Sequence, residues 1–198
     1  MPDEAAIRHL LDAACGLVEE RTDLARFIGA TRVPSPLCLA AKQLPACRHW
    51  APALALANSR SAAIAEALTP LGELFHWLQN PNYTDAVMGD GYMDNYAYAN
   101  VVGGRSLLGG NDYALGVLLL GPGLTYPPHS HPADEIYYVV GGTAEWRYGD
   151  EPWTRRAPGS LIDHPSGLVH ATRTGDEPLL ALYFWWGDIA THAGLVEA

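Results

Sequence analysis

After residue 90 the sequence is divided into short runs of β-branched, aromatic and aliphatic residues, with Gly, Pro and Asp between them. Gly141-Gly142 and Gly149-Asp150 stand where hairpin turns are expected. Many short strands at this spacing are typical of a sandwich or a closed barrel, and no internal repeat suggests a second one. The predicted strands are residues 96–102, 113–120, 135–140, 143–148, 160–163, 169–173 and 179–186.

The first eighty residues carry helical signals instead. Asp3 is positioned to cap a helix whose apolar side chains recur every three or four residues. We predict a long first helix here and shorter ones further along. The apolar positions of the first helix are Ile7, Leu10, Leu11, Ala14, Leu17 and Val18, and the shorter helices are expected at residues 24–28, 46–57 and 61–67.

The change of character near residue 80 divides the chain. Thr69 followed by Pro70 is typical of a helix start, and we expect this helix to continue through Leu78. No flexible linker is evident after it. We therefore predict a helical extension (residues 1–80) packed outside a barrel (residues 81–198), with the two forming one compact unit.

The chain has a formal charge of −10 and only twelve Lys and Arg, without a basic cluster. Such a surface repels phosphate backbones and anionic lipids, so we expect neither nucleic acid nor a membrane as a partner. The three cysteines are odd in number and lack C-x-x-C spacing, which favours reduced thiols. The N-terminus does not resemble a secretory signal, and no apolar run approaches the ~20 residues that span a bilayer. We predict a cytoplasmic protein.

One segment combines imidazoles and a carboxylate at spacings that suit a metal ion. His129 and His131 are two residues apart on an extended chain, so their side chains point to the same side. In the strand that follows, Glu135 and Tyr137 share a face by the same rule, and His170 comes from a separate strand. Two or three imidazoles with one carboxylate suit a transition metal that binds substrate or water. We interpret His9, His49, His76 and His192 as structural or solvated, and we place His164 between strands, outside the site.

The same segment resembles the first cupin motif, G-x5-H-x-H-x3-E-x6-G, at every specified position from Gly123 to Gly142. The second cupin motif, G-x5-P-x-G-x2-H-x3-N, is matched except at its last position, where Thr174 replaces Asn. That position is not a ligand in the family, so the expected metal site is intact. The resemblance implies a mostly β fold with a single cupin (double-stranded β-helix or jelly-roll) barrel and one divalent metal ion. The second motif is matched by Gly159, Pro165, Gly167 and His170, and the implied ligands are His129, His131, Glu135 and His170.

Tyr137 shares a predicted face with Glu135, which brings a phenol beside the expected ion. A phenol has a pKa near ~10 and is a poor base at neutral pH. A neighbouring cation favours the phenolate, which is then equipped to remove a proton from carbon. The residues alone leave a second interpretation open, in which Tyr137 only packs or hydrogen-bonds a ligand.

A second resemblance extends over most of the chain. The pattern Tyr126-x2-His129-x-His131-x3-Glu135-x-Tyr137 is similar to the cupin dimethylsulfoniopropionate (DMSP) lyases, in particular the DddQ group. It implies that Tyr137 is the catalytic base and that Tyr126 helps to bind or gate the substrate. Further likeness comes from Asn80-Pro81-Asn82-Tyr83, Asp94-Asn95-Tyr96 and His170. The implied metal ligands are His131, Glu135 and His170, with His129 either a ligand or a neighbour of the substrate.

The two charged ends of DMSP fit such a site. Its carboxylate can bind the metal ion, which neutralises charge as the α-proton leaves. Tyr137 would take that proton, dimethyl sulfide would leave the β-carbon, and acrylate would remain. A sulfonium cannot donate a hydrogen bond, so aromatic faces are its natural partners. We predict that Tyr126, His129 and Trp185 contact this zwitterion.

Other functions remain compatible with the residues. The same ligands serve an iron-dependent oxygenase, which consumes dioxygen, and a metal-dependent isomerase or epimerase, whose product keeps the substrate's mass. A non-catalytic metal- or ligand-binding cupin is a third alternative, although the N-terminal helices lack the basic face of a DNA-binding sensor. Iron, manganese and zinc all accept His and Glu ligands, so the metal stays open. We expect a monomer or a homodimer.

Overall fold

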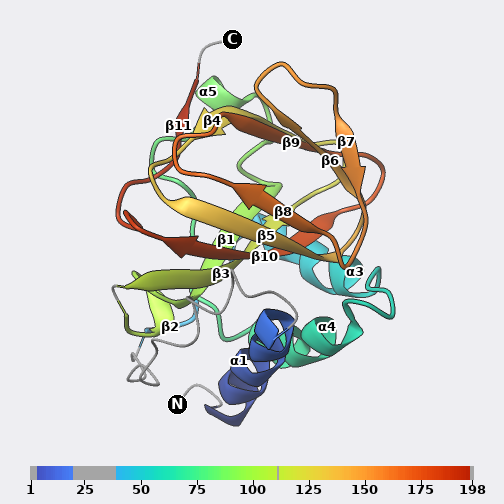
Figure 1. Ribbon diagram of the computed structural model, residues 1–198, viewed down its shortest axis with the longest axis vertical. Helices are drawn as coiled ribbons and strands as arrows, with labels where there is room; N and C mark the ends of the chain where they lie inside the picture. Colours follow the sequence, from blue (N-terminus) through green and yellow to red (C-terminus); the bar gives the residue numbers. More distant parts are fainter. Residues whose placement is uncertain (1–3, 20–38, 111, 197–198) are drawn as a thin grey trace.

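The computed structural model describes residues 4–19, 39–110 and 112–196. Strands fill most of the second half of the chain (Figure 1). In order they are β1 (Tyr96–Val102), β2 (Ser106–Leu108), β3 (Tyr113–Leu120), β4 (Thr125–Ser130), β5 (Asp134–Gly141), β6 (Ala144–Tyr148), β7 (Thr154–Arg156), β8 (Leu161–His164), β9 (His170–Thr174), β10 (Leu179–Trp186) and β11 (Gly194–Leu195).

These strands form two sheets that face each other. The larger sheet has the order β2-β1-β3-β10-β5-β8, and the smaller has the order β11-β4-β9-β6-β7. Strand β10 lies between β3 and β5 and pairs with both in antiparallel register. Strand β10 therefore lies near the middle of the larger sheet. Successive side chains of each strand point to opposite faces of this sheet.

Helices α1, α3 and α4 lie on the side of the larger sheet that is away from the smaller one, whereas the short α5 lies near β4 and β11 (Figure 1). Helix α3 contacts β5 and β10, and α4 contacts β5 and α1. Among the described residues, no helix has the length and apolar character needed to cross a membrane. The helical elements are α1 (Glu4–Glu19), η1 (Pro45–His49), α3 (Trp50–Leu54), α4 (Ala62–Leu68), η2 (Thr69–Leu71) and α5 (Asp85–Met88).

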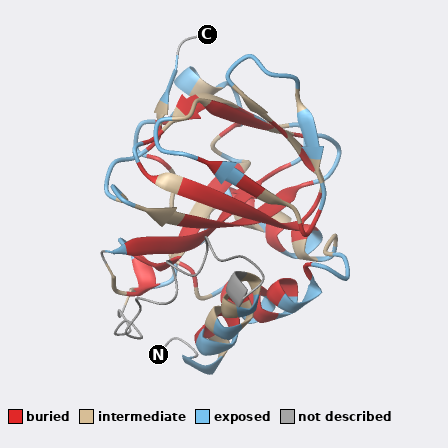
Figure 2. Ribbon diagram, viewed as in Figure 1, coloured by how far each residue is buried: buried red, intermediate tan, exposed pale blue. Residues whose placement is uncertain are grey.

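Alternate residues of the larger sheet enter two separate cores. On β5, Ile136, Tyr138 and Val140 face the helices, whereas Tyr137 and Val139 face the smaller sheet. Figure 2 shows that these strands are buried while the connecting loops are exposed. The alternation predicted for this strand is confirmed, and the predicted phenol points into the space between the sheets. We call that space the interior.

Seven strands lie at or within a residue or two of their predicted positions. Strands β2, β4, β7 and β11 were not predicted. Strand β4 contains Pro127 and Pro128, which cannot donate to a ladder and so make its sequence look unlike a strand. The predicted first helix is present as α1, and the helix expected at residues 61–67 is α4.

The helix predicted from Thr69 through Leu78 is wrong. Only a 3-10 turn forms there, and the Thr69 hydroxyl donates to a carbonyl of α4 instead of capping a new helix. Phe75 and Trp77 are both fully buried and alternate with less buried neighbours, so this stretch has the period of a strand. Leu78 accordingly forms a bridge with Tyr98 of β1. Burial of two aromatic rings on one side has overridden the local helix signal.

Two other expectations are resolved differently. Residues 46–57 form the 3-10 helix η1 followed by the short α3 instead of one helix. The helix predicted at residues 24–28 lies outside the described residues, as does Cys38. Cys47 is a free thiol, and the reduced state of all three cysteines stays a prediction.

Candidate metal centre and adjoining cavity

Three histidines share one hydrogen-bonding pattern. Each uses its Nδ1 atom to bond a backbone carbonyl two residues away, and because a carbonyl only accepts, Nδ1 must carry the hydrogen. In the neutral ring the lone pair is then on Nε2, the atom that a metal ion would bind. The bonds join His129 to Pro127, His131 to Ala133 and His170 to Leu168, at 2.8, 2.9 and 2.9 Å.

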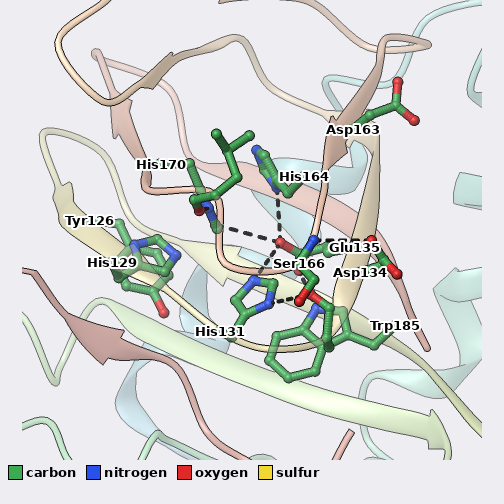
Figure 3. Close-up of polar contacts among 12 residues, drawn as sticks. Tyr126, His129, His131, Asp134, Glu135, Asp163, His164, Ser166, His170 and Trp185 are labelled. Atoms are coloured by element: carbon green, nitrogen blue, oxygen red, sulfur yellow. Dashed lines mark hydrogen bonds and ion pairs between the residues drawn. The ribbon is translucent and has the colours of Figure 1, made fainter. Parts of the chain in front are cut away.

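The carboxylate of Glu135 lies among imidazoles (Figure 3). Its Oε2 atom is 3.2 Å from Nε2 of His131 and 3.6 Å from Nε2 of His170. One ligand atom from each of these three residues lies within 4.8 Å of the others, and all three side chains are buried. Three of the predicted ligands therefore come together from β5, β9 and the segment after β4.

The electrostatics of this cluster call for a cation. Burial raises the pKa of Glu135, but hydrogen bonds from His131 and His164 outweigh it and hold the pKa well below its ordinary value. Burial likewise opposes protonation of His131, yet the bond to Glu135 raises its pKa. An Nε2 atom without a hydrogen would repel this carboxylate, so a proton or a metal ion must lie between them.

His170 supplies a further sign that the site fits a metal ion. Its Nε2 atom is buried and has no hydrogen-bond partner among the described residues. Burial, followed by the neighbouring His129 and His164, lowers its pKa well below the ordinary value, so the ring is neutral. A buried nitrogen lone pair without a partner is unfavourable unless something binds it. The arrangement of two imidazoles and a carboxylate is compatible with a metal ion.

His129 stands apart from this three-residue cluster. Its ring stacks on Tyr126 at 3.8 Å with an interplanar angle of 7°, and it pairs across the strands with His170. Burial lowers the pKa of His129 to about 4, so it is neutral near pH 7. Its role as a ligand stays a prediction, and its contact with Tyr126 also suits the predicted role beside a substrate.

The prediction that His164 lies between strands is wrong. His164 is the last residue of β8 and is fully buried, and it lies directly opposite Glu135 in the ladder of β5 and β8. Its Nδ1 donates to Oε2 of Glu135 at 2.9 Å, and its ring stacks on His170 at 3.8 Å. Ile162 is also buried and lies two residues earlier, so strand periodicity was the signal that placed His164 inward.

Trp185 completes the surroundings of the carboxylate. It lies opposite Glu135 in the ladder of β5 and β10, and its indole N–H donates to Oε1 of Glu135. Its ring is 4.3 Å from that of His131. Both carboxylate oxygens therefore have hydrogen-bond donors, which fixes the orientation of Glu135.

Tyr137 lies one pleat further along β5 and is buried, with its ring 5.5 Å from His164. Burial and then the negative charge of Glu135 raise the pKa of Tyr137 well above its ordinary value. The protein by itself therefore keeps this phenol protonated. A cation at the cluster would act in the opposite direction.

A cavity of about 100 Å³ adjoins this cluster. A buried water needs roughly 10–15 Å³ of cavity volume, so the cavity has space for a small molecule. Glu135, Tyr137, Tyr126 and Trp185 are among the residues that line it. The direction of the other lining residues was not predictable from the sequence. They include Asn80, Tyr96, Tyr98, Asn100, Leu118, Tyr183, Ile189 and His192.

Known proteins that are similar to this chain include dimethylsulfoniopropionate (DMSP) lyases. The family model of dimethylsulfoniopropionate lyase matches residues 20–181. The DMSP lyase DddQ of Ruegeria pomeroyi is 37% identical over 69% of this chain and 67% of its own length. A putative DMSP lyase, DddL of Cereibacter sphaeroides, is 40% identical over 47% of this chain and 39% of its own length.

Solved structures of such proteins share the whole fold. The crystal structure of DddQ from Ruegeria pomeroyi has a TM-score of 0.84 and 31% identity, and the match covers 96% of both chains. A chain from the crystal structures of the DMSP lyases RdDddP and RnDddQII has a TM-score of 0.87 and 26% identity, over 98% of this chain and 99% of that one. The predicted mostly β cupin fold is confirmed.

Proposed function

The chain belongs to the dimethylsulfoniopropionate lyase family, and on that basis we propose that it cleaves DMSP to dimethyl sulfide and acrylate. One observation within the molecule carries the proposal. Tyr137 and Glu135 line the same cavity from adjacent inward positions of β5, so a phenol adjoins the candidate metal ligands. That pairing supports proton removal next to a carboxylate, the first requirement of this elimination.

His131, Glu135 and His170 would hold one divalent transition-metal ion, with iron, manganese and zinc all suited to such ligands. When bound, the ion supplies positive charge that stabilises both the carboxylate of the substrate and the phenolate of Tyr137. The Nδ1 bonds of the histidines orient each Nε2 for this task, and Trp185 and His164 keep Glu135 in place.

The residues of the chain would then act as follows. Tyr137 as phenolate takes the α-proton, and the electron pair of that C–H bond becomes the new C=C bond. The C–S bond breaks, its electron pair leaves with sulfur, and neutral dimethyl sulfide departs. Tyr126, His129 and Trp185 position the substrate beside the base. The side chains around the site are mostly buried, so electrostatic interactions with the developing charge are stronger there than in bulk water.

The function is tested by headspace gas chromatography of purified protein with DMSP and added iron, manganese or zinc. We expect dimethyl sulfide and acrylate in equal amounts, and the same rate under anaerobic conditions. Dioxygen consumption coupled to turnover would indicate an oxygenase instead. A product with the mass of DMSP would indicate an isomerase.

Metal dependence is tested separately by elemental analysis. The His131→Ala/His170→Ala double variant is expected to lose bound metal, because two of the three ligands are gone. His9→Ala is the control, since His9 is exposed on α1 far from the site. Full metal content in the double variant would exclude the proposed centre, whatever the activity of the protein.

A further inference from the structure

Four residues stand in register across the larger sheet. Tyr183 of β10 lies opposite Tyr137 of β5 on one side and Gly116 of β3 on the other, and Gly116 lies opposite Asn100 of β1. Tyr137, Tyr183 and Asn100 all line the cavity. We call these four residues the Tyr183 row. The row extends from the candidate base on β5 to Asn100 on β1, and we call the part of the cavity next to Asn100 its far end.

The side chain of Tyr183 extends from β10 over the neighbouring strand β3. Neighbouring strands are ~4.8 Å apart, so Asn100 is roughly 10 Å away, two strands over. The Tyr183 hydroxyl nevertheless donates to Oδ1 of Asn100. The ring reaches that far because position 116 is glycine: a Cβ there would collide with the phenol end of Tyr183. Asn100 and Gly116 thus hold the ring against the sheet, with its other side toward the cavity.

The chemistry of the cavity wall suits a cation without a hydrogen to donate. Among the described residues, its lining contains no Lys, Arg or Asp, and its single carboxylate is Glu135. Both oxygens of Glu135 already have donors, so a cation at the far end has no ion pair to form. Aromatic rings line the cavity instead, and Tyr183 is 6.4 Å from Tyr137 and 6.1 Å from Trp185, centre to centre.

A methylated sulfonium or quaternary ammonium fits such a wall. Its charge is spread over methyl groups, so it loses little hydration on burial, and the faces of aromatic rings attract it. Tyr183 is one same-face step along β10 from Trp185, a distance of about 7 Å. That step suits a short molecule with its carboxylate near Glu135 and its cation over Tyr183.

We propose that the ring of Tyr183 binds the methylated cationic end of the substrate, an inference that rests on the proposed function. Asn100 holds this ring over Gly116. The site then selects small zwitterions with a sulfonium or quaternary ammonium at one end and a carboxylate at the other. Tyr183 is a binding residue that determines specificity, distinct from the base and from the metal ligands.

The test uses two ligands that cannot be distinguished by shape. These are 3-(trimethylammonio)propionate and 4,4-dimethylpentanoate, which share the carboxylate and the branched end but differ by one positive charge. Their dissociation constants are measured by calorimetry on the metal-loaded protein. We expect the wild type to prefer the cation by roughly fivefold to thirtyfold, the range of a desolvated cation–π contact. Equal binding of the two, or failure of the cation to bind, would overturn the proposal.

Variants assign the preference to the ring. Tyr183→Leu is expected to bring the ratio of the two constants to within about twofold. Phe184→Leu is the matched control, because Phe184 is an equally buried ring on the opposite face of β10 and should keep the wild-type ratio. An unchanged ratio in Tyr183→Leu would refute the assignment. The wild-type comparison decides the cation preference even where a variant does not fold.

These outcomes are independent of the lyase reaction. Dimethyl sulfide release by the wild type is measured in parallel. Cation preference without dimethyl sulfide would leave the Tyr183 site and reject the proposed function. Dimethyl sulfide without cation preference would keep the function and reject the site.

Discussion

The two faces of the larger sheet are built from alternate residues of the same strands, yet their chemistry differs completely. On β10, Leu180, Leu182 and Phe184 pack against the helices, whereas Tyr183 and Trp185 face the interior. The outer face gains stability from apolar burial, which needs no partners. The inner face buries imidazoles, phenols and a carboxylate, and each of these requires a hydrogen bond or an ion.

One sheet thereby keeps the residues that stabilise the fold apart from those that form the site. The outer core fixes the backbone of β5 and β10, and that backbone in turn sets the register that brings Trp185 opposite Glu135 and Tyr183 opposite Tyr137. The inner face is then free to hold unfavourable groups. His164 and His170 each keep a buried Nε2 without a hydrogen-bond partner among the described residues. Substitutions on the two faces should therefore affect different measurements.

The largest contrast is expected between two adjacent tyrosines of β5. Tyr137→Phe removes the proposed base and should lower dimethyl sulfide release by about 10²- to 10⁴-fold while metal content and fold persist. Tyr138→Phe removes the outer hydroxyl, which donates to the carbonyl of Arg60, and should lower unfolding free energy by only about 1 kcal/mol. Headspace chromatography and urea unfolding measure the two effects. Activity of Tyr137→Phe within a few-fold of the parent would eliminate Tyr137 as the base.

The reverse contrast is expected at Phe184. This ring is fully buried on the outer face, so Phe184→Ala should lower the free energy of unfolding by about 3–4 kcal/mol. Urea unfolding measures this loss. The protein that remains folded should keep its metal affinity, because Phe184 touches no ligand of the proposed centre. A large loss of metal affinity in that fraction would mean that the two faces are not separable.

Low pH should lower the stability of the fold through the buried histidines of the inner face. The folded protein holds the pKa of His129 at about 4, below the ordinary value of 6.5, so between these values the unfolded chain binds more protons. Stability of the metal-free protein should therefore fall as pH drops from about 6.5 toward 4, by about 2–3 kcal/mol for His129 alone. The lowered pKa of His170 acts in the same direction, while the raised pKa of His131 offsets part of the loss.

Urea unfolding in the presence of a chelator, repeated across this pH range, measures the effect. His129→Gln removes one titrating group and should make the decline shallower. Among the described residues, the buried ionisable side chains other than tyrosine all belong to the inner site, so the outer core contributes nothing to this slope. Stability that is constant between pH 6.5 and 5 would contradict the buried, neutral state of His129.

Strand positions and the inward direction of Glu135 and Tyr137 were predictable because alternation is a local property of the backbone. The helix predicted from Thr69 was wrong because Phe75 and Trp77 pack on distant parts of the fold, and no local pattern reports such contacts. Register is equally non-local. That Tyr183, Gly116 and Asn100 align across three strands depends on pairing that the sequence does not state.

The residues of the site were predictable where the motif fixed their spacing. The prediction failed where strand pairing decided which residues lie together. His131, Glu135 and His170 were identified from their residue types and intervals. His164 was excluded because the strand was predicted to end at Asp163, which placed His164 between strands, whereas β8 includes it as its last residue. The ladder of β5 and β8 nonetheless places it opposite Glu135.

The smallest expected effect is the change in metal affinity on substitution of His164. His164→Leu removes the Nδ1 donor to Glu135 and should weaken metal binding by about 10- to 100-fold, the usual consequence of losing a hydrogen bond to a ligand. His164→Asn should retain most of the affinity, because its amide nitrogen replaces Nδ1 in position and as a donor. Competition with a chromophoric chelator measures both constants. Asp163→Asn is the control, since the preceding residue is exposed on the other side of β8. If Leu and Asn at position 164 bind metal equally well, His164 is only a packing residue, and the hydrogen bond to Glu135 does not orient the carboxylate.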